Sequence, residues 1–130
     1  MREIVYKNTD FAEFFLFEHY VIAQLKEGAL LEPKNNKQTI KIVEEHYASE
    51  PFVYIANRNF AYNVSPMTYL QSSEIENLIG ICIVTQTEIS QNTAHFEGRF
   101  FKKEFLVIGT IEEGINWAMD LVSSYKNKND

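Results

Sequence analysis

A chain of 130 residues is long enough for one compact domain that buries most of its apolar surface without disulfides or metals. Hydrophobic residues make up 45% of the sequence and aromatic residues 14%, a composition that excludes an intrinsically disordered chain. The formal net charge of −6 repels polyanions, so we expect neither nucleic acid nor an anionic membrane surface as a partner.

The amino-terminal residues lack the apolar core of a signal peptide. No apolar run approaches the roughly 20 residues that cross a membrane, so the sequence predicts a cytoplasmic protein without a membrane span. The single cysteine, Cys82, cannot form an internal disulfide. It lies in the apolar run 78–84, which predicts a small buried side chain rather than a reactive thiol.

The first part of the chain predicts two strands and then a helix. Residues 13–18 and 20–27 are rich in aromatic and branched side chains, which favour strands. They form either a tight hairpin or one long bent strand, and the sequence does not decide between the two. A polar loop at 33–37 then leads into a helix, whose inward-facing residues are expected to be Ile40, Val43 and Tyr47.

Three further strands alternate with helices. The apolar runs 52–56 and 78–84 predict strands that are covered on both faces, and 104–108 predicts a shorter one. Between the first two, Ser65 and Pro66 open a helix that is expected to end near residue 77 and to bury Met67 and Leu70.

The last two helices have contrasting signals. A helix over 88–101 is predicted from an apolar stripe at helical spacing, formed by Ile89, Thr93, Phe96 and Phe100. The final helix begins at a capping box of Thr110 and Glu113. Its predicted buried stripe consists of Ile111, Ile115, Ala118, Val122 and Tyr125.

Together these elements give the order β-β-α-β-α-β-α-β-α. Such alternation predicts one small α/β domain with a mixed, mostly parallel sheet and helical cover. We place this domain at 13–126, an amino-terminal segment at 1–12 and a frayed tail at 127–130.

The order of elements, in a chain this short, resembles the STAS fold, the sulfate-transporter and anti-sigma-factor-antagonist domain, with its SpoIIAA-like bacterial relatives. The resemblance covers residues 13–125 and rests on the element order and on the strand, loop and helix at 52–70. It implies a bacterial, non-enzymatic module that acts through contacts with a protein partner or as a homodimer. A topological kinship to lipid-binding Sec14-type domains implies the alternative, a pocket for a lipid or another small apolar or anionic ligand.

One residue has a counterpart in the regulatory motif of these proteins. In anti-sigma-factor antagonists the helix after the third strand begins with an Asp-Ser-Ser/Thr-Gly type of motif, whose hydroxyl a partner kinase phosphorylates. Asn63-Val64-Ser65-Pro66-Met67 stands at the matching place, so the resemblance makes Ser65 a candidate phosphosite. The acidic residue and the glycine of that motif are absent. The residues themselves favour a helix cap, since serine before proline commonly opens a helix.

The loop after the strand 52–56 holds the candidate ligand or partner residues, which are Asn57, Arg58, Asn59, Tyr62 and Asn63. Ligands of α/β domains bind most often at the carboxyl ends of strands. Arg58 would clamp a carboxylate or phosphate there, with the amides and Tyr62 completing the polar contacts. The alternative is that the amides bond the loop's own backbone while Phe60 and Tyr62 pack onto the core.

No combination of residues predicts catalysis. The three histidines, His19, His46 and His95, are scattered and lack the spacing of metal ligands. The five glycines form no phosphate-binding motif, and the basic run 99–103 is expected to complement a helix C-terminus. We therefore predict a protein without catalytic residues, metal or cofactor.

Overall fold

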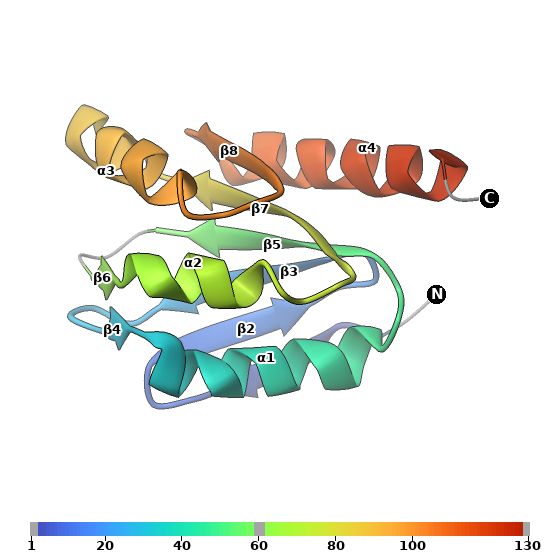
Figure 1. Ribbon diagram of the computed structural model, residues 1–130, viewed down its shortest axis with the longest axis horizontal. Helices are drawn as coiled ribbons and strands as arrows, with labels where there is room; N and C mark the ends of the chain where they lie inside the picture. The colour runs from blue at the N-terminus through green and yellow to red at the C-terminus, as the bar shows by residue number, and fades with distance from the viewer. Residues whose placement is uncertain (1–2, 59–61, 129–130) are drawn as a thin grey trace.

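The computed structural model describes residues 3–58 and 62–128 (Figure 1). The strands are β1 (Val5–Asn8), β2 (Ala12–Leu16), β3 (Tyr20–Leu25), β4 (Leu30–Leu31), β5 (Phe52–Asn57), β6 (Asn63–Val64), β7 (Leu78–Val84) and β8 (Glu104–Ile108). The helices are α1 (Pro33–Tyr47), α2 (Pro66–Ser72), α3 (Glu88–Gly98) and α4 (Ile111–Lys128).

The main sheet has six strands in the order β1-β2-β3-β5-β7-β8. β1, β2 and β3 pair antiparallel, whereas β3, β5, β7 and β8 pair parallel, so the predicted mixed and mostly parallel sheet is confirmed. Because β2 and β3 are antiparallel neighbours, the chain forms a hairpin at Glu18 and His19 rather than one bent strand. β4 and β6 form a small second sheet of two parallel strands.

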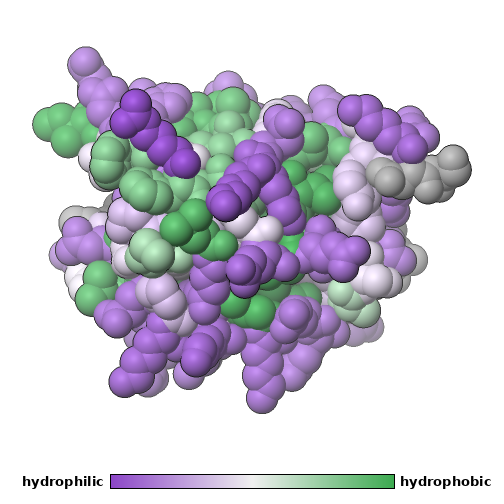
Figure 2. Space-filling model, in the orientation of Figure 1, coloured by the Kyte–Doolittle hydropathy of each residue, from purple (hydrophilic) through white to green (hydrophobic). Residues whose placement is uncertain are grey.

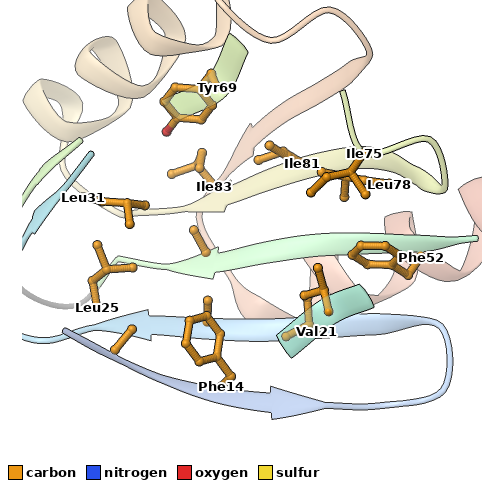
Figure 3. Close-up of a cluster of buried hydrophobic side chains, with 14 of the residues drawn as sticks. Phe14, Val21, Leu25, Leu31, Phe52, Tyr69, Ile75, Leu78, Ile81 and Ile83 are labelled. Carbon is orange, nitrogen blue, oxygen red and sulfur yellow. The ribbon is translucent and has the colours of Figure 1, made fainter. Parts of the chain in front are cut away.

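Helices cover both faces of the main sheet (Figure 1). Helix α4 packs on one face, over a cluster that includes Val53, Ile55 and Cys82. Helices α1, α2 and α3 lie on the other face, over a larger cluster in which side chains of the strands and of α2 point toward one another (Figure 3). Cys82 is fully buried, as predicted, and burial together with the nearby Glu113 raises the pKa of its thiol to about 12.

Helix α1 begins earlier than the sequence predicted. Residues 33–37 are not a polar loop but the first turns of the helix, with Pro33 at the first helical position. The backbone N–H of Glu32 donates to Asn35 Oδ1 at 2.8 Å, which satisfies a group at the helix start. The buried face therefore includes the polar residues Asn36 and Thr39 in addition to the predicted Val43 and Tyr47.

The predicted buried face of α2 is wrong, and the spacing that predicted α3 does not mark the face that α3 buries. Helix α2 ends at Ser72 and buries Thr68 and Tyr69, while Met67 is 55% exposed. Helix α3 turns Ala94 and Glu97 inward, while Ile89 and Phe96 of the stripe are 80% and 54% exposed and Phe100, beyond the helix end, packs partly buried against the core. The spacing located α3 correctly but not the face that it buries, because the burial of Glu97 depends on partners elsewhere in the chain.

The ends of the domain also differ from the prediction. Val5–Asn8, placed in an amino-terminal segment, forms the edge strand β1. Helix α4 opens at the predicted capping position, where the Glu113 N–H donates to Thr110 Oγ1 at 3.2 Å. The helix continues to Lys128, so residues 127 and 128 of the predicted tail are helical rather than frayed.

Candidate functional site

The buried side chain of Arg58 is at the centre of the candidate site. Arg58 follows β5 directly, and its backbone N–H donates to the Val84 carbonyl at the end of β7 at 2.9 Å. This bond fixes the residue at the carboxyl ends of two parallel strands. Its guanidinium points inward and donates through Nη2 to Glu97 Oε1 at 2.8 Å, with only 8% of the arginine and 9% of the glutamate side chain exposed.

A tyrosine completes this pair. The Tyr69 hydroxyl donates to the same Glu97 oxygen at 2.9 Å. Burial and the adjacent Glu97 carboxylate raise the pKa of Tyr69 well above its ordinary value, so the phenol remains a donor. Glu97 and Tyr69 were not among the predicted site residues. Glu97 lies 39 positions after Arg58, and nothing in the pattern of its own helix distinguishes it from a solvated acid.

Tyr62 packs against the arginine on its other side. The guanidinium carbon of Arg58 lies 4.8 Å from the centre of the Tyr62 ring, within the range of a cation–π contact. Burial alone would lower the pKa of Arg58, but its interactions with Tyr62 and Glu97 outweigh that effect and raise it, so Arg58 stays charged. Burial raises the pKa of Tyr62, and the positive charge of Arg58 offsets part of this increase.

An internal cavity of about 40 Å³ lies between α1, α2 and the sheet. Its walls are mostly apolar, and many of the residues in Figure 3 line it, among them Leu25, Leu31, Phe52, Tyr69, Ile75, Ile81 and Ile83. Two buried polar atoms of its lining residues, Thr39 Oγ1 and Arg58 Nε, have no hydrogen-bond partner among the described residues. A buried polar group without a partner costs free energy, so the wall of the cavity is incompletely satisfied at these two atoms.

An open groove of about 660 Å³ lies on the outer side of Arg58. It runs along the carboxyl ends of the strands, between Gly28 and Asn63 on one side and the first turns of α3 on the other. Arg58 and Tyr62 line both the groove and the cavity. The pair of Arg58 and Tyr62 therefore borders both the open groove and the small apolar cavity.

The other predicted loop residues are less involved. Asn57 is the last residue of β5, and Asn63 pairs with Leu30 in the small sheet, where its N–H donates to the Ala29 carbonyl. Asn59, like Phe60, lies outside the described residues. Tyr62 packs against the core, as one of the two alternatives predicted.

Ser65 occupies the predicted position before α2, but the structure shows no cap bond from its side chain. Its backbone N–H donates to the Leu31 carbonyl, and its carbonyl accepts from the Thr68 N–H. The helix start is thus fixed through the backbone and the small β4–β6 sheet. Phosphorylation of Ser65 stays a prediction.

The basic run 99–103 has a structural use at one residue. The Lys103 ammonium donates to the Leu78 carbonyl at 2.7 Å and also to the Ile75 carbonyl, so it tethers the turn between α2 and β7. Burial lowers the pKa of Lys103. The sequence predicted that this basic run would complement the end of a helix, but the ammonium of Lys103 donates to carbonyls of the turn between α2 and β7 instead.

None of the described helices is long and apolar enough to cross a membrane. Within residues 3–58 and 62–128, no three side chains of the His, Cys, Asp and Glu types gather in a metal-binding arrangement.

Comparisons with known proteins bear on the fold. No protein-family model and no curated protein matches the sequence. Among solved structures, the crystal structure of an uncharacterised protein of the DUF3478 family with a SpoIIAA-like fold, from Shewanella loihica PV-4, is similar, with a TM-score of 0.55 and 13% sequence identity. The match covers 89% of this chain and 92% of that chain. At this identity the likeness concerns the fold alone, and it confirms that the chain has the SpoIIAA-like α/β architecture that its order of strands and helices resembles.

Proposed function

We propose that this protein is a non-enzymatic binding module that takes a small molecule at Arg58, with the ligand lying in the groove and inserting one end into the cavity. The observation that carries the proposal is the pair of unpartnered buried atoms, Thr39 Oγ1 and Arg58 Nε, on the wall of one cavity. The groove volume falls within the range of roughly 300–1,000 Å³ that is usual for ligand sites.

The size of the cavity limits what enters it. A water-sized group needs roughly 10–15 Å³ of such volume, so 40 Å³ admits about three or four non-hydrogen atoms. The rest of the ligand would remain in the groove. A terminal group of three atoms, such as a primary amide or a methyl ketone, has the right size.

The charge of the site favours a neutral group over an anion. Arg58 is already paired with Glu97 inside the protein, so an added carboxylate would leave one uncompensated negative charge in a buried setting. A neutral carbonyl oxygen accepts from Arg58 Nε without that penalty. Thr39 can either donate to such a group or accept from it.

Catalysis receives no support from the groups around the site. Burial and Glu113 keep the Cys82 thiol protonated, and Cys82 lies on the face of the sheet that α4 covers. The described lining of groove and cavity contains no histidine and no free carboxylate to act as a base.

A matched pair of probes tests the proposal. We expect butyramide to shift the amide NMR resonances of residues that line the cavity, and butyrate, which has the same size and a negative charge, to shift them far less. Butyrate binding more tightly would contradict the neutral-ligand assignment. If neither compound binds and the protein isolated under gentle conditions has the mass of the bare chain, the small-molecule function is wrong.

Two buried threonines provide variants. Thr39→Val removes the unpartnered hydroxyl, so we expect it to weaken butyramide binding without lowering the free energy of unfolding. Thr68, which also lines the cavity, donates to the Leu31 carbonyl at 3.3 Å. Thr68→Val should therefore be destabilising by about 1 kcal/mol while it affects binding less. Equal effects of the two variants on binding would argue against a contact between the ligand and Thr39.

A further inference from the structure

The outward face of α3 adjoins the groove beside Arg58 at Ile89 and Thr93, but the ligand site does not account for its exposed Phe96. Ile89 and Phe96 are exposed by 80% and 54%, although both are large and apolar. Figure 2 shows apolar side chains gathered over the region that α3 and α2 occupy in Figure 1. Helix α3 buries only Ala94 and Glu97, so most of its surface is available for contact.

Charges of opposite sign stand at the two ends of this face. Glu88, in the first turn, and Arg99, at the C-cap with helical backbone angles, are both exposed. Eleven residues correspond to three helical turns plus about 20°, so the two side chains leave the helix on the same side, about 16 Å apart along its axis. Phe96 lies within about 80° of both, and the residues 89–96 include no Lys, Arg, Asp or Glu.

We propose that this surface, the α3 face of Glu88, Asn92, Phe96 and Arg99 with Ile89 at its border, packs antiparallel against the α3 face of a second copy of the chain. In an antiparallel pair about a two-fold axis, the start of one helix lies beside the end of the other. Glu88 then meets Arg99 of the second copy, twice by symmetry, with the two Phe96 rings between them. A parallel arrangement would place like charges together.

A second copy is favoured over other occupants on grounds of charge. Each chain carries a net charge of −6, so two copies repel each other except where the approaching surfaces are neutral or complementary. The α3 face meets both conditions, because its middle is uncharged and its two ends carry charges of opposite sign. The same negative charge disfavours an anionic membrane surface. A contact built on three helical turns is small, so the dimer should have a dissociation constant in the micromolar range or weaker.

Charge reversal with rescue tests the pairing. Sedimentation equilibrium over a concentration series should show a reversible dimer of the unmodified chain. Glu88→Arg alone and Arg99→Glu alone each replace two attractive contacts with two repulsive ones, and should raise the dissociation constant roughly tenfold or more. The double variant restores opposite charges and should recover most of the affinity.

Glu112→Arg is the matched control, because Glu112 is an exposed acid in the first turn of α4 and lies outside the α3 face. It should leave the dimer unchanged, and Phe96→Ser should abolish it. Thermal unfolding of every variant shows whether the fold persists. A chain that is monomeric at all concentrations overturns the proposal. So does a dimer that the single reversals do not weaken or that the double variant does not restore, and neither result bears on ligand binding at Arg58.

Discussion

At the scale of single residues, the Glu97 carboxylate determines whether Arg58 can stay buried. It accepts from both the Arg58 guanidinium and the Tyr69 hydroxyl, and it is the only ion-pair partner of Arg58 in the described part of the chain. Glu97→Gln keeps the shape and removes the charge, which leaves the arginine without compensation. We expect the free energy of unfolding to fall by about 3–5 kcal/mol in urea titrations.

The exposed carboxylate of Glu74 supplies the comparison. Glu74→Gln should change the free energy of unfolding by no more than about 0.5 kcal/mol, because its side chain is solvated. A Glu97→Gln variant as stable as Glu74→Gln would mean that the buried pair contributes little beyond a neutral hydrogen bond.

The sequence predicted one member of the buried ion pair, Arg58, but not its partner Glu97. It identified Arg58 as a clamp for a carboxylate, and the residue does bind one, but the carboxylate belongs to the same chain. Arg58 could be recognised as a binding residue because polar residues surround it in the sequence. Its partner lies in another helix, and only the folded sheet brings β5 and α3 together.

At the scale of elements, Gly98 sets how closely α3 approaches β8. A Cβ at this position would lie 2.4 Å from ring atoms of Phe105, which itself packs against Tyr69 and Phe101. Gly98→Ala must displace that ring. The strain should exceed the gain of up to about 1 kcal/mol that alanine provides in a helix, so we expect a net loss of about 1–2 kcal/mol in the free energy of unfolding.

Gly109 is the control for this substitution. A Cβ there meets no atom within 4 Å, so Gly109→Ala should be neutral or slightly stabilising. If Gly98→Ala proves as stable as Gly109→Ala, then α3 moves away from β8 without strain, and the packing of the two elements is looser than the contact with Phe105 suggests.

The elements differ in how well the sequence predicts them. The long apolar runs at β5 and β7 and the capping signals of α4 determine local structure strongly, and these predictions are confirmed. The two-residue strands β4 and β6 have no periodicity to detect and exist through their pairing with each other. The face that α3 buries could not be predicted, because it consists of the small residue Ala94 and the acid Glu97, whose ion-pair partner lies far away in the sequence.

At the scale of the whole molecule, the buried tyrosines should make the protein lose stability in alkali. Burial raises the pKa of Tyr54, Tyr62 and Tyr69 above the value of about 10 that holds in the unfolded chain. The folded state thus retains protons that the unfolded state releases. The stabilisation is complete below about pH 10 and declines as the pH rises toward the folded-state pKa values, by up to about 1.4 kcal/mol per pH unit for each tyrosine.

Two other groups modify this profile. Cys82 acts in the same direction from about pH 9, since its pKa is about 12 in the folded state. Lys103 acts in the opposite direction, because burial lowers its pKa and the folded state releases its proton first. Three tyrosines and a thiol outweigh one partly buried lysine, so the net change is a loss.

Tyr69→Phe separates the contribution of one phenol from the rest. The variant should be less stable at neutral pH by about 1.5–3 kcal/mol, because the hydrogen bond to the Glu97 carboxylate is lost. It should also lose stability less steeply above about pH 10, so its curve converges on that of the unmodified protein, as urea titrations at a series of pH values would show. Phe52→Leu, which removes no titrating group from the same cluster, should lower the curve without changing its slope. Parallel curves for Tyr69→Phe and the unmodified protein would mean that Tyr69 ionises as readily in the folded chain as in the unfolded one, and that the Arg58, Glu97 and Tyr69 network is open to solvent.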